Sequence, residues 1–419
     1  MTASDSARPV HGAWRVYGLA LLLACTPTPW TAAQNNAPPR VVAIGDIHGD
    51  VDSLAGILKH AGLTDANGSW SGGNATFVQV GDSTDRGAKV RPVLDLLMAL
   101  EEQAKAAGGR VAVLLGNHEV LNLIGEGGYV TPEIYATFAD DQSEQRRLAA
   151  YDAYVKLCAE RAGQLRPVPR VYQPLPKAAW MDAHPLGFVE YREALSPQGT
   201  YGRWLRTRPA VLRLNDTVFM HAGINPDKAP RALDDINKQV AGEIKRFDDF
   251  RSRMIDRKMI LPFFTLREVL DVAQIEVETS AANSRTSDGG AGGLDALSVP
   301  DSLGLRGLLG INSWALVNPD GPLWFRGFAT WSAEVGAIQS KYLLQRYNVA
   351  HFVAGHTIMP NRRITARFSA AVFLIDTGML ASYAPRGVAS ALEINDGRFS
   401  AIYADERMTL LERDNSSRR

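Results

Sequence analysis

One pattern, which occurs five times, constrains the fold of this chain more than any other feature. A short apolar run, rich in β-branched residues, leads into a segment that contains glycine and a polar side chain of a type that binds metal. Short apolar runs bounded by glycine are typical of buried strands. The five runs cover residues 41–44, 77–80, 111–115, 218–220 and 352–354. The side chains that follow them are Asp46, His48, Asp82, Asn117, His221 and His356.

Helical patterns separate the first three runs. Asp52 is a predicted N-cap for a helix that carries Leu54, Ile57 and Leu58 and ends near Gly62. A longer helix is predicted over residues 90–107, with one apolar stripe and a stop at Gly108. Strands that alternate with helices indicate a sheet covered by helices, and ligands of such sheets gather beyond the carboxyl ends of the strands. We therefore expect the six polar side chains to meet at one edge.

The six side chains are carboxylate, amide and imidazole groups. A single histidine at the end of an apolar strand is usually a core residue, although imidazole is the commonest metal ligand. Six such groups in equivalent positions favour a metal site instead. Mixed oxygen and nitrogen ligands without thiolate suit manganese, iron or zinc.

The motifs themselves resemble a known family. GDIHG (45–49), GDSTDRG (81–87), GNHE (116–119), HAG (221–223) and GHT (355–357), in this order, are similar to the motif set of the phosphoprotein phosphatases among the calcineurin-like metallophosphoesterases. GNHEVLNLIG (116–125) and GPLWFRGF (321–328) resemble the Shewanella-like protein phosphatase branch. The resemblance spans about residues 40–380, with a poorly matched insertion at about 125–205.

This resemblance implies a fold and a set of roles. The fold would be a four-layer α/β/β/α arrangement, a central β-sandwich flanked by helices, with two divalent or trivalent metal ions. Asp46 and His48 would bind the first metal and Asp82 would bridge both. The second metal would be bound by Asn117, His221 and His356. Arg86 would bind the phosphate, with help from Arg326. His118 would act as the general acid and would be oriented by Asp85.

The chemistry of phosphate-ester hydrolysis agrees with these roles. Two metals ~3.5–4 Å apart activate a bridging hydroxide and stabilise both ends of an in-line displacement. A bridging carboxylate such as Asp82 holds metals that close. The guanidinium of Arg86 offers a planar fork for phosphate oxygens. The alternative for Arg86 is a structural ion pair with Asp85.

Three functions remain open at this point. The leading one is hydrolysis of phosphomonoesters, either a small phosphoester or a protein phosphorylated on Ser/Thr or Tyr. A dinucleoside polyphosphate hydrolase carries similar motifs, and a non-catalytic, metal-stabilised envelope protein could bind a phosphorylated partner. Nuclease relatives usually have a second histidine where this chain has Ile358. Lysine plus arginine (45) balances aspartate plus glutamate (45), so no nucleic-acid partner is expected.

The N-terminus has the pattern of an export signal. Arg8 and Arg15 precede an apolar run at 16–24, which is too short to span a membrane. Residues 22–25 resemble a lipobox, which predicts a signal ending at 24 and a lipid on Cys25. The alternative is ordinary cleavage after Ala33, which would remove a signal peptide of residues 1–33. Both readings predict an exported, periplasmic protein whose catalytic domain covers residues 40–419.

Other segments receive more general predictions. A polar helix is expected over 141–161, an irregular glycine-rich loop over 283–302 and a hairpin over 392–403. His60 and His351 are expected to be structural, and His184 to lie at the surface with substrate contact as the alternative. Arg203, Arg206 and Arg208 are expected to form a solvated basic face.

Overall fold

The computed structural model describes residues 39–286 and 299–412. The chain from Pro38 onward forms a single compact unit, and the following description concerns this unit. The predicted export signal, including Cys25, and the central part of the glycine-rich stretch lie outside the described residues. None of the described helices is long and apolar enough to cross a membrane.

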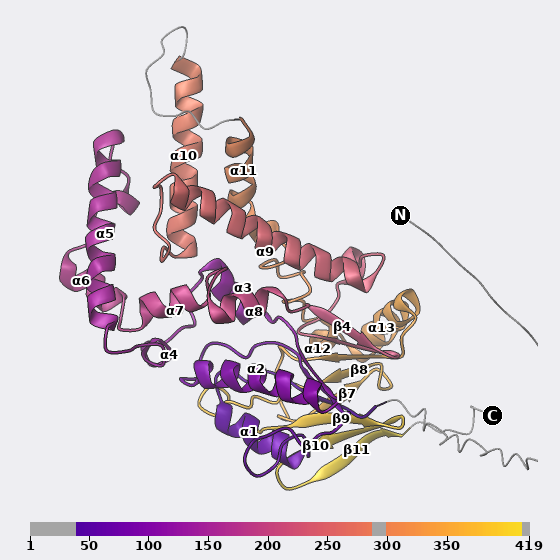
Figure 1. Cartoon of the computed structure of the whole chain (residues 1–419). Coiled ribbons are helices and arrows are strands. Elements are labelled where there is room, and N and C mark those ends of the chain that lie inside the picture. Colours follow the sequence, from indigo (N-terminus) through magenta and orange to yellow (C-terminus); the bar gives the residue numbers. More distant parts are fainter. Residues whose placement is uncertain (1–38, 287–298, 413–419) are drawn as a thin grey trace, which may run out of the picture. The chain divides into compact units, whose positions relative to one another are not determined.

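A six-stranded sheet carries the first three sequence motifs (Figure 1). Its strand order is β11-β10-β9-β1-β2-β3, in which β1, β2 and β3 are parallel and β9 is antiparallel to β1. The predicted hairpin is confirmed as β9 and β10, with β11 added beside it. The strands are β1 (Val41–Ile44), β2 (Thr76–Gln79), β3 (Arg110–Val113), β9 (Ala391–Asn395), β10 (Arg398–Ile402) and β11 (Arg407–Glu412).

A five-stranded sheet, ordered β4-β5-β6-β8-β7, carries the remaining motifs. Here β5, β6 and β8 run parallel, so their carboxyl ends share one edge. The sequence pattern predicted β5 and β6 but not β4, β7 or β8. The strands are β4 (Val211–Leu214), β5 (Thr217–Met220), β6 (His351–Ala354), β7 (Thr365–Arg367) and β8 (Val372–Leu374).

The two sheets pack face to face. Their shared core contains Val78 and Val80 from one side and Phe219 and Val353 from the other. Helices α1 (Val51–His60) and α2 (Val90–Ala106) cover the outer face of the first sheet through a separate apolar cluster. The second sheet packs its other face on a larger cluster that includes α13 (Ala333–Tyr347). The expected four-layer fold is thereby confirmed.

Both predicted helices of the first layer are present, with one correction. The side chain that caps α1 belongs to Asp50, which accepts a hydrogen bond from Ser53 N at 3.0 Å, and not to Asp52. Asp52 lies inside the first turn, where it forms an ion pair with Lys89. The apolar periodicity located the helix, but two neighbouring aspartates left the cap ambiguous.

Helices make up the predicted insertion and continue well beyond it. Residues 125–205 form α4 (Pro132–Ala136), α5 (Ser143–Gln164), α6 (Lys177–Ala183), α7 (Phe188–Ala194) and α8 (Thr200–Arg206). Three more helices follow β5: α9 (Leu233–Asp256), α10 (Leu266–Thr286) and α11 (Val299–Leu309). The predicted loop over 283–302 was therefore too long, because α10 and α11 enter it from both ends.

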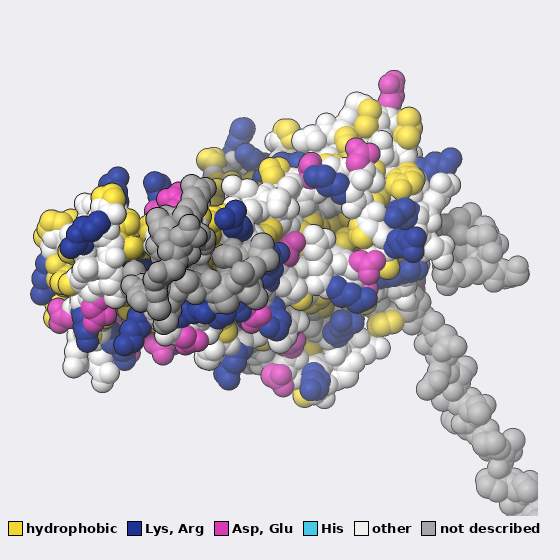
Figure 2. All heavy atoms as spheres, turned by 90° about the horizontal axis from the view of Figure 1, so that it is seen from above, with side chains coloured by type: hydrophobic (Ala, Val, Ile, Leu, Met, Phe, Trp, Pro, Cys, Tyr) yellow, Lys and Arg dark blue, Asp and Glu magenta, His cyan; other side chains and the backbone are white. Residues whose placement is uncertain are grey.

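The predicted basic face is neutralised at two of its three arginines. Arg206 forms a two-pronged ion pair with Asp248, and Arg208 pairs with Glu101. His184 stacks on Trp180 at 4.0 Å between ring centroids, which gives it a packing role. On the face shown in Figure 2, basic and acidic side chains are interspersed.

Phe373 and Phe399 stack between the two sheets at 4.6 Å, and both are almost fully buried. Replacing Phe399 by alanine should therefore lower the free energy of unfolding by about 3–5 kcal/mol. Ile338→Ala, at a position 68% exposed, should change it by no more than about 0.5 kcal/mol. Urea titration of both variants measures the difference, and equal midpoints would contradict this description of the core.

Candidate metal centre

All six predicted ligand residues lie at strand ends and converge on one region. Asp46 and His48 follow β1, Asp82 follows β2, and Asn117 begins α3 (Asn117–Ile124) directly after β3. His221 and His356 follow β5 and β6 of the other sheet. All six are buried. The site thus lies between the two sheets, at the edge where the parallel strands end.

The backbone at this edge is strained. His48, Asp82, Asp85, Arg86 and His356 all have positive φ, between 49° and 68°. Non-glycine residues rarely adopt this conformation, and such outliers cluster at functional sites. Here the left-handed turns direct consecutive side chains of one loop into the same small volume.

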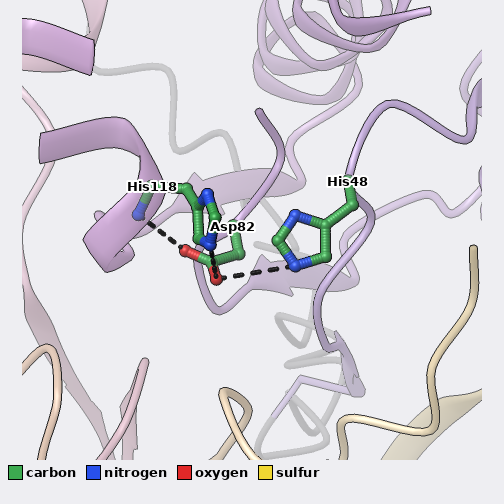
Figure 3. Close-up of side chains that lie close together, drawn as sticks. All are labelled: His48, Asp82 and His118. Atoms are coloured by element: carbon green, nitrogen blue, oxygen red, sulfur yellow. Dashed lines mark hydrogen bonds and ion pairs between the residues drawn. The ribbon is translucent and has the colours of Figure 1, made fainter. Parts of the chain in front are cut away.

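His48 and Asp82 form the centre of the first ligand group (Figure 3). His48 Nε2 lies 3.7 Å from Asp82 Oδ2 and 3.9 Å from Asp46 Oδ2. The other ring nitrogen, Nδ1, faces the Thr84 carbonyl at 3.0 Å and must donate to it. Neutral His48 therefore presents a lone pair on Nε2 to the two carboxylates, and burial lowers its pKa to about 3, which keeps the ring neutral.

The second group brings four nitrogen and oxygen atoms of ligand-type side chains together. His221 Nε2 lies 2.8 Å from Asn117 Oδ1, 3.0 Å from His356 Nδ1 and 3.3 Å from Asp82 Oδ1. The opposite ring nitrogens donate to the carbonyls of Val80 and Trp324. The ring nitrogens His221 Nε2 and His356 Nδ1 therefore face each other within the second group.

The ligand set fits metal ions. Ligand atoms of His48, Asp82 and His118 lie within 4.8 Å of one another, and so do those of Asp82, His221 and His356. Asp82 belongs to both groups, as a bridging ligand would. His48, His221 and His356 each donate their other N–H to a backbone carbonyl, the arrangement that orients metal-binding imidazoles. A cation in each group would relieve the repulsion between the crowded carboxylates.

His118 and Asp85 form the predicted pair. His118 Nδ1 donates to Asp85 Oδ2 at 2.7 Å, and its Nε2 accepts from Arg86 Nη2 at 3.1 Å. Burial would lower the pKa of His118, but the charges of Asp82 and Asp85 outweigh it and raise the pKa. His118 is thus oriented and kept basic without needing to bind metal.

A chain of hydrogen bonds that the sequence did not indicate supports this pair. Asn122 donates to Asp85 Oδ1 at 2.8 Å and to the His118 carbonyl at 2.9 Å. Tyr191, on α7, donates its hydroxyl to Asn122 Oδ1 at 2.6 Å. Asn122 and Tyr191 are both buried. The helical insertion therefore contributes directly to positioning His118.

Arg86 is available for an anion. Among the described residues no carboxylate forms an ion pair with it, so the alternative of a structural pair with Asp85 is wrong, because Asp85 pairs with His118. The guanidinium lies over the ring of Tyr383 at 3.8 Å and near that of Tyr129 at 5.2 Å. Arg326 is exposed and donates to the His356 carbonyl and to Thr357 Oγ1, beside the second ligand group.

Two further acidic residues belong to this centre, and the sequence pattern gave neither a role. Glu119 lies within the GNHE motif and binds backbone N–H groups of both neighbouring loops. Asp376 follows β8 and faces Asp46. The pKa of Asp46 is raised well above its usual range, first by burial and second by the charge of Asp376. The run Phe373–Ile375 before Asp376 repeats the strand-end pattern, so the same rule could have found it.

Comparisons with known proteins agree with this geometry. Residues 39–241 match the calcineurin-like phosphoesterase family. The chain is 33% identical over 215 residues to Shewanella-like protein phosphatase 2 of Arabidopsis thaliana. This aligned segment covers 50% of this chain and 53% of that protein. It is 27% identical over 219 residues to Shewanella-like protein phosphatase 1 of Plasmodium berghei, 51% of this chain and 48% of that protein. The chain thus matches about half the length of these curated relatives.

Solved structures show the same fold. A cold-active protein tyrosine phosphatase superposes with a TM-score of 0.52 over 90% of this chain and 79% of its own, at 24% identity. A second structure of such an enzyme, from a psychrophilic Shewanella species, gives 0.51 over 89% and 81%. The sandwich, the strand-end ligands and the family match together assign residues 39–241 of this chain to the calcineurin-like phosphoesterases.

Proposed function

We propose that this protein is a metal-dependent phosphatase that hydrolyses phosphomonoesters. The observation that carries the proposal is an unpaired guanidinium, Arg86, hydrogen-bonded to an oriented imidazole, His118, beside two ligand groups that share one carboxylate. A protein that only bound a phosphorylated partner would need the guanidinium but not the imidazole–carboxylate pair.

Two metals would be held by the residues described above. Asp46 and His48 would bind the first, Asn117, His221 and His356 the second, and Asp82 both; Asp376 stands next to Asp46 as an additional carboxylate. When bound, the metals supply charge neutralisation for the phosphate and an activated water nucleophile. The donor set suits manganese, iron or zinc.

The side chains of the chain itself bind the phosphate and protonate the leaving group. Arg86 offers two parallel N–H donors to phosphate oxygens, and the faces of Tyr383 and Tyr129 restrict its position. His118, hydrogen-bonded to Asp85, would donate its proton to the departing oxygen. Arg326, beside the second ligand group, would assist in phosphate binding.

A phosphorylated protein is the substrate class that we favour. The relatives named above are protein phosphatases, and the aromatic rings of Tyr129 and Tyr383, both about 45% exposed, provide apolar walls beside Arg86 for the group that bears the phosphate. Turnover of p-nitrophenyl phosphate with manganese tests the phosphatase activity. Phosphopeptides assayed against diadenosine tetraphosphate then distinguish a protein phosphatase from a dinucleoside polyphosphate hydrolase.

The bridging role of Asp82 can be measured through metal content. Asp82→Asn should lose both metals, because the shared carboxylate is the only charged ligand common to the two groups among the described residues. Asn117→Ala should mainly weaken the second metal, since the Asn117 side chain lies against His221 of that group. Elemental analysis of purified variants provides the readout. Two metals per chain and full activity in Asp82→Asn would exclude the two-metal arrangement.

The role of His118 can be tested with leaving groups of different basicity. An alkoxide, as from phosphoserine, needs a proton more than the phenolate of phosphotyrosine, and a nitrophenolate needs it least. His118→Asn should therefore reduce turnover of phosphoserine peptides most, by roughly 10²–10⁴-fold, and p-nitrophenyl phosphate least. Steady-state rates on the three substrates measure the pattern.

Metal content serves as the control for this variant, because His118 adjoins Asn117 and lost metal would slow all three reactions alike. With both metals retained, a uniform decrease would reject the general-acid role. His118 would then bind phosphate or support the loop.

For the location of the protein, the motif at residues 22–25 supports export as a lipoprotein with a lipid on Cys25. Cells that express the full chain should incorporate labelled palmitate into it, and Cys25→Ser should abolish both labelling and membrane partitioning. A soluble mature protein that begins at Gln34 would instead support ordinary signal cleavage. Full-length protein in the cytoplasm would disprove both.

A further inference from the structure

A cavity of about 660 Å³ lies among three helices of the helical part, α5, α7 and α9, and we refer to it as the α5–α7–α9 cavity. Each helix lines it with side chains spaced three and four residues apart, the spacing of one helical face. On α5 this face carries Ala149, Ala150 and Ala153. Small side chains on one of three facing helices leave the space open, and its volume is typical of small-molecule sites.

The walls are mainly apolar but carry two unusual charges. Val189 of α7, Ile255 of α9 and Phe263 of the following loop contribute apolar surface. Arg192 of α7 and Arg251 of α9 also line the cavity, and both are partly buried. Apolar walls with a few placed charges are typical of sites for amphipathic ligands.

The other charged groups on the lining are paired or exposed. Arg146 pairs with Asp140 and Glu190, and Asp248 is occupied by both prongs of Arg206. Glu193 is exposed. Glu268 and Glu126 act on Arg192, and Asp248 acts on Arg251, only through their charges and without a direct ion pair.

Within the described part of the chain, neither arginine forms an ion pair. Arg192 Nη2 donates to the Phe264 carbonyl at 3.1 Å, while its buried Nε has no hydrogen-bond partner among the described residues. Among the described residues, the Arg251 side chain donates only to the Pro262 carbonyl. Burial, and next the positive charge of Arg192, lower the pKa of Arg251 to about 9. A partly buried charge without an ion-pair partner is costly, and an anion beside the two guanidiniums would offset that cost.

We propose that the α5–α7–α9 cavity binds an amphipathic anion, with its acidic head between Arg192 and Arg251 and its aliphatic chain along the alanine face of α5. This assignment goes beyond the proposed phosphatase activity and does not depend on it. The chemical class is a single acidic head on an unbranched aliphatic chain, of which a medium-chain carboxylate is the simplest member.

Decanoate, used below its critical micelle concentration, is a suitable probe for calorimetric titration of the full chain. Decanoate should bind at least about tenfold more tightly than each of three comparison compounds. Decanol lacks the negative charge, decylammonium carries a positive charge instead, and acetate lacks the aliphatic chain. Arg251→Leu should weaken decanoate binding at least about tenfold. Arg253→Leu, two residues along α9 at an exposed position outside the lining, is the matched control and should leave it unchanged within twofold.

A second pair of variants tests the chain-binding part. Ala153→Leu should fill the cavity and weaken decanoate binding, whereas Ala159→Leu, on an exposed face of the same helix, should not. If Arg251→Leu does not fold, Arg251→Lys is used in its place. The site of binding is then checked separately by NMR spectra of methyl-labelled alanines. On saturation of the unsubstituted protein, the methyl groups of Ala149 and Ala153 should shift and that of Ala159 should not.

The outcomes are separable from those for phosphatase activity, because binding is measured without substrate. No detectable decanoate binding to the unsubstituted protein would overturn the proposal. So would decanol binding as tightly as decanoate, or an equal loss in the cavity variants and their controls. Binding that shifts only alanine methyls outside the cavity would place the ligand elsewhere and would also reject it.

Discussion

The geometry of the metal centre depends on one buried carboxylate, that of Glu119. It accepts hydrogen bonds from the backbone N–H groups of Asp82, Ser83, Thr84 and Gly116 and from the Thr84 hydroxyl. Several residues of the loop after β2 have positive φ, and among the described residues the N–H groups of Asp82, Ser83 and Thr84 have no backbone acceptor. Glu119 satisfies its orphaned donors and ties that loop to the start of α3, so that Asp82 and Asn117 face the same volume.

The centre also concentrates charge where the protein alone cannot neutralise it. Burial raises the pKa of Glu119 and the charge of Asp82 adds to this, although the backbone donors oppose both. Asp46 and Asp376 face each other nearby, and burial raises the pKa of Asp376 to about 6. Carboxylates crowded in this way repel one another unless a cation lies between them. The folded sandwich therefore holds the acidic groups in place, and metal binding would relieve the repulsion that the fold creates.

Much of this arrangement could be predicted from sequence because strand ends combine two strong local signals. Apolar runs located β1, β2, β5 and β6 within about one residue, and the polar residues after them marked the site. Strand β8 obeys the same rule through Asp376, since the apolar run over residues 370–375 leads into it, but this run was not included in the pattern. The amphipathic pattern of α9 was available in the sequence, since Ile236, Val240 and Ile244 recur at helical spacing.

Other features depend on contacts between distant segments, which local patterns cannot supply. Nothing in the sequence around Tyr191 indicates that its hydroxyl lies against Asn122, 69 residues away. The pairing of Asp85 with His118 instead of Arg86 is equally a tertiary result. It follows from the position of α3 relative to the loop after β2, and Glu119 sets that position. The family resemblance supplied the His118 pair, while the geometry explains why Arg86 remains unpaired.

The hydrogen bond from Tyr191 has a consequence for how this protein can be divided. Poorly matched insertions are often treated as accessory modules that can be trimmed to obtain a minimal domain. Here, excision of residues 125–205 would remove the donor to Asn122 Oδ1, and a buried amide oxygen without a partner costs about 1–3 kcal/mol. Asn122 would then be free to rotate away from Asp85. The helices therefore help to hold Asp85 and His118 in place, and a shortened version would have to supply a replacement hydroxyl at that position.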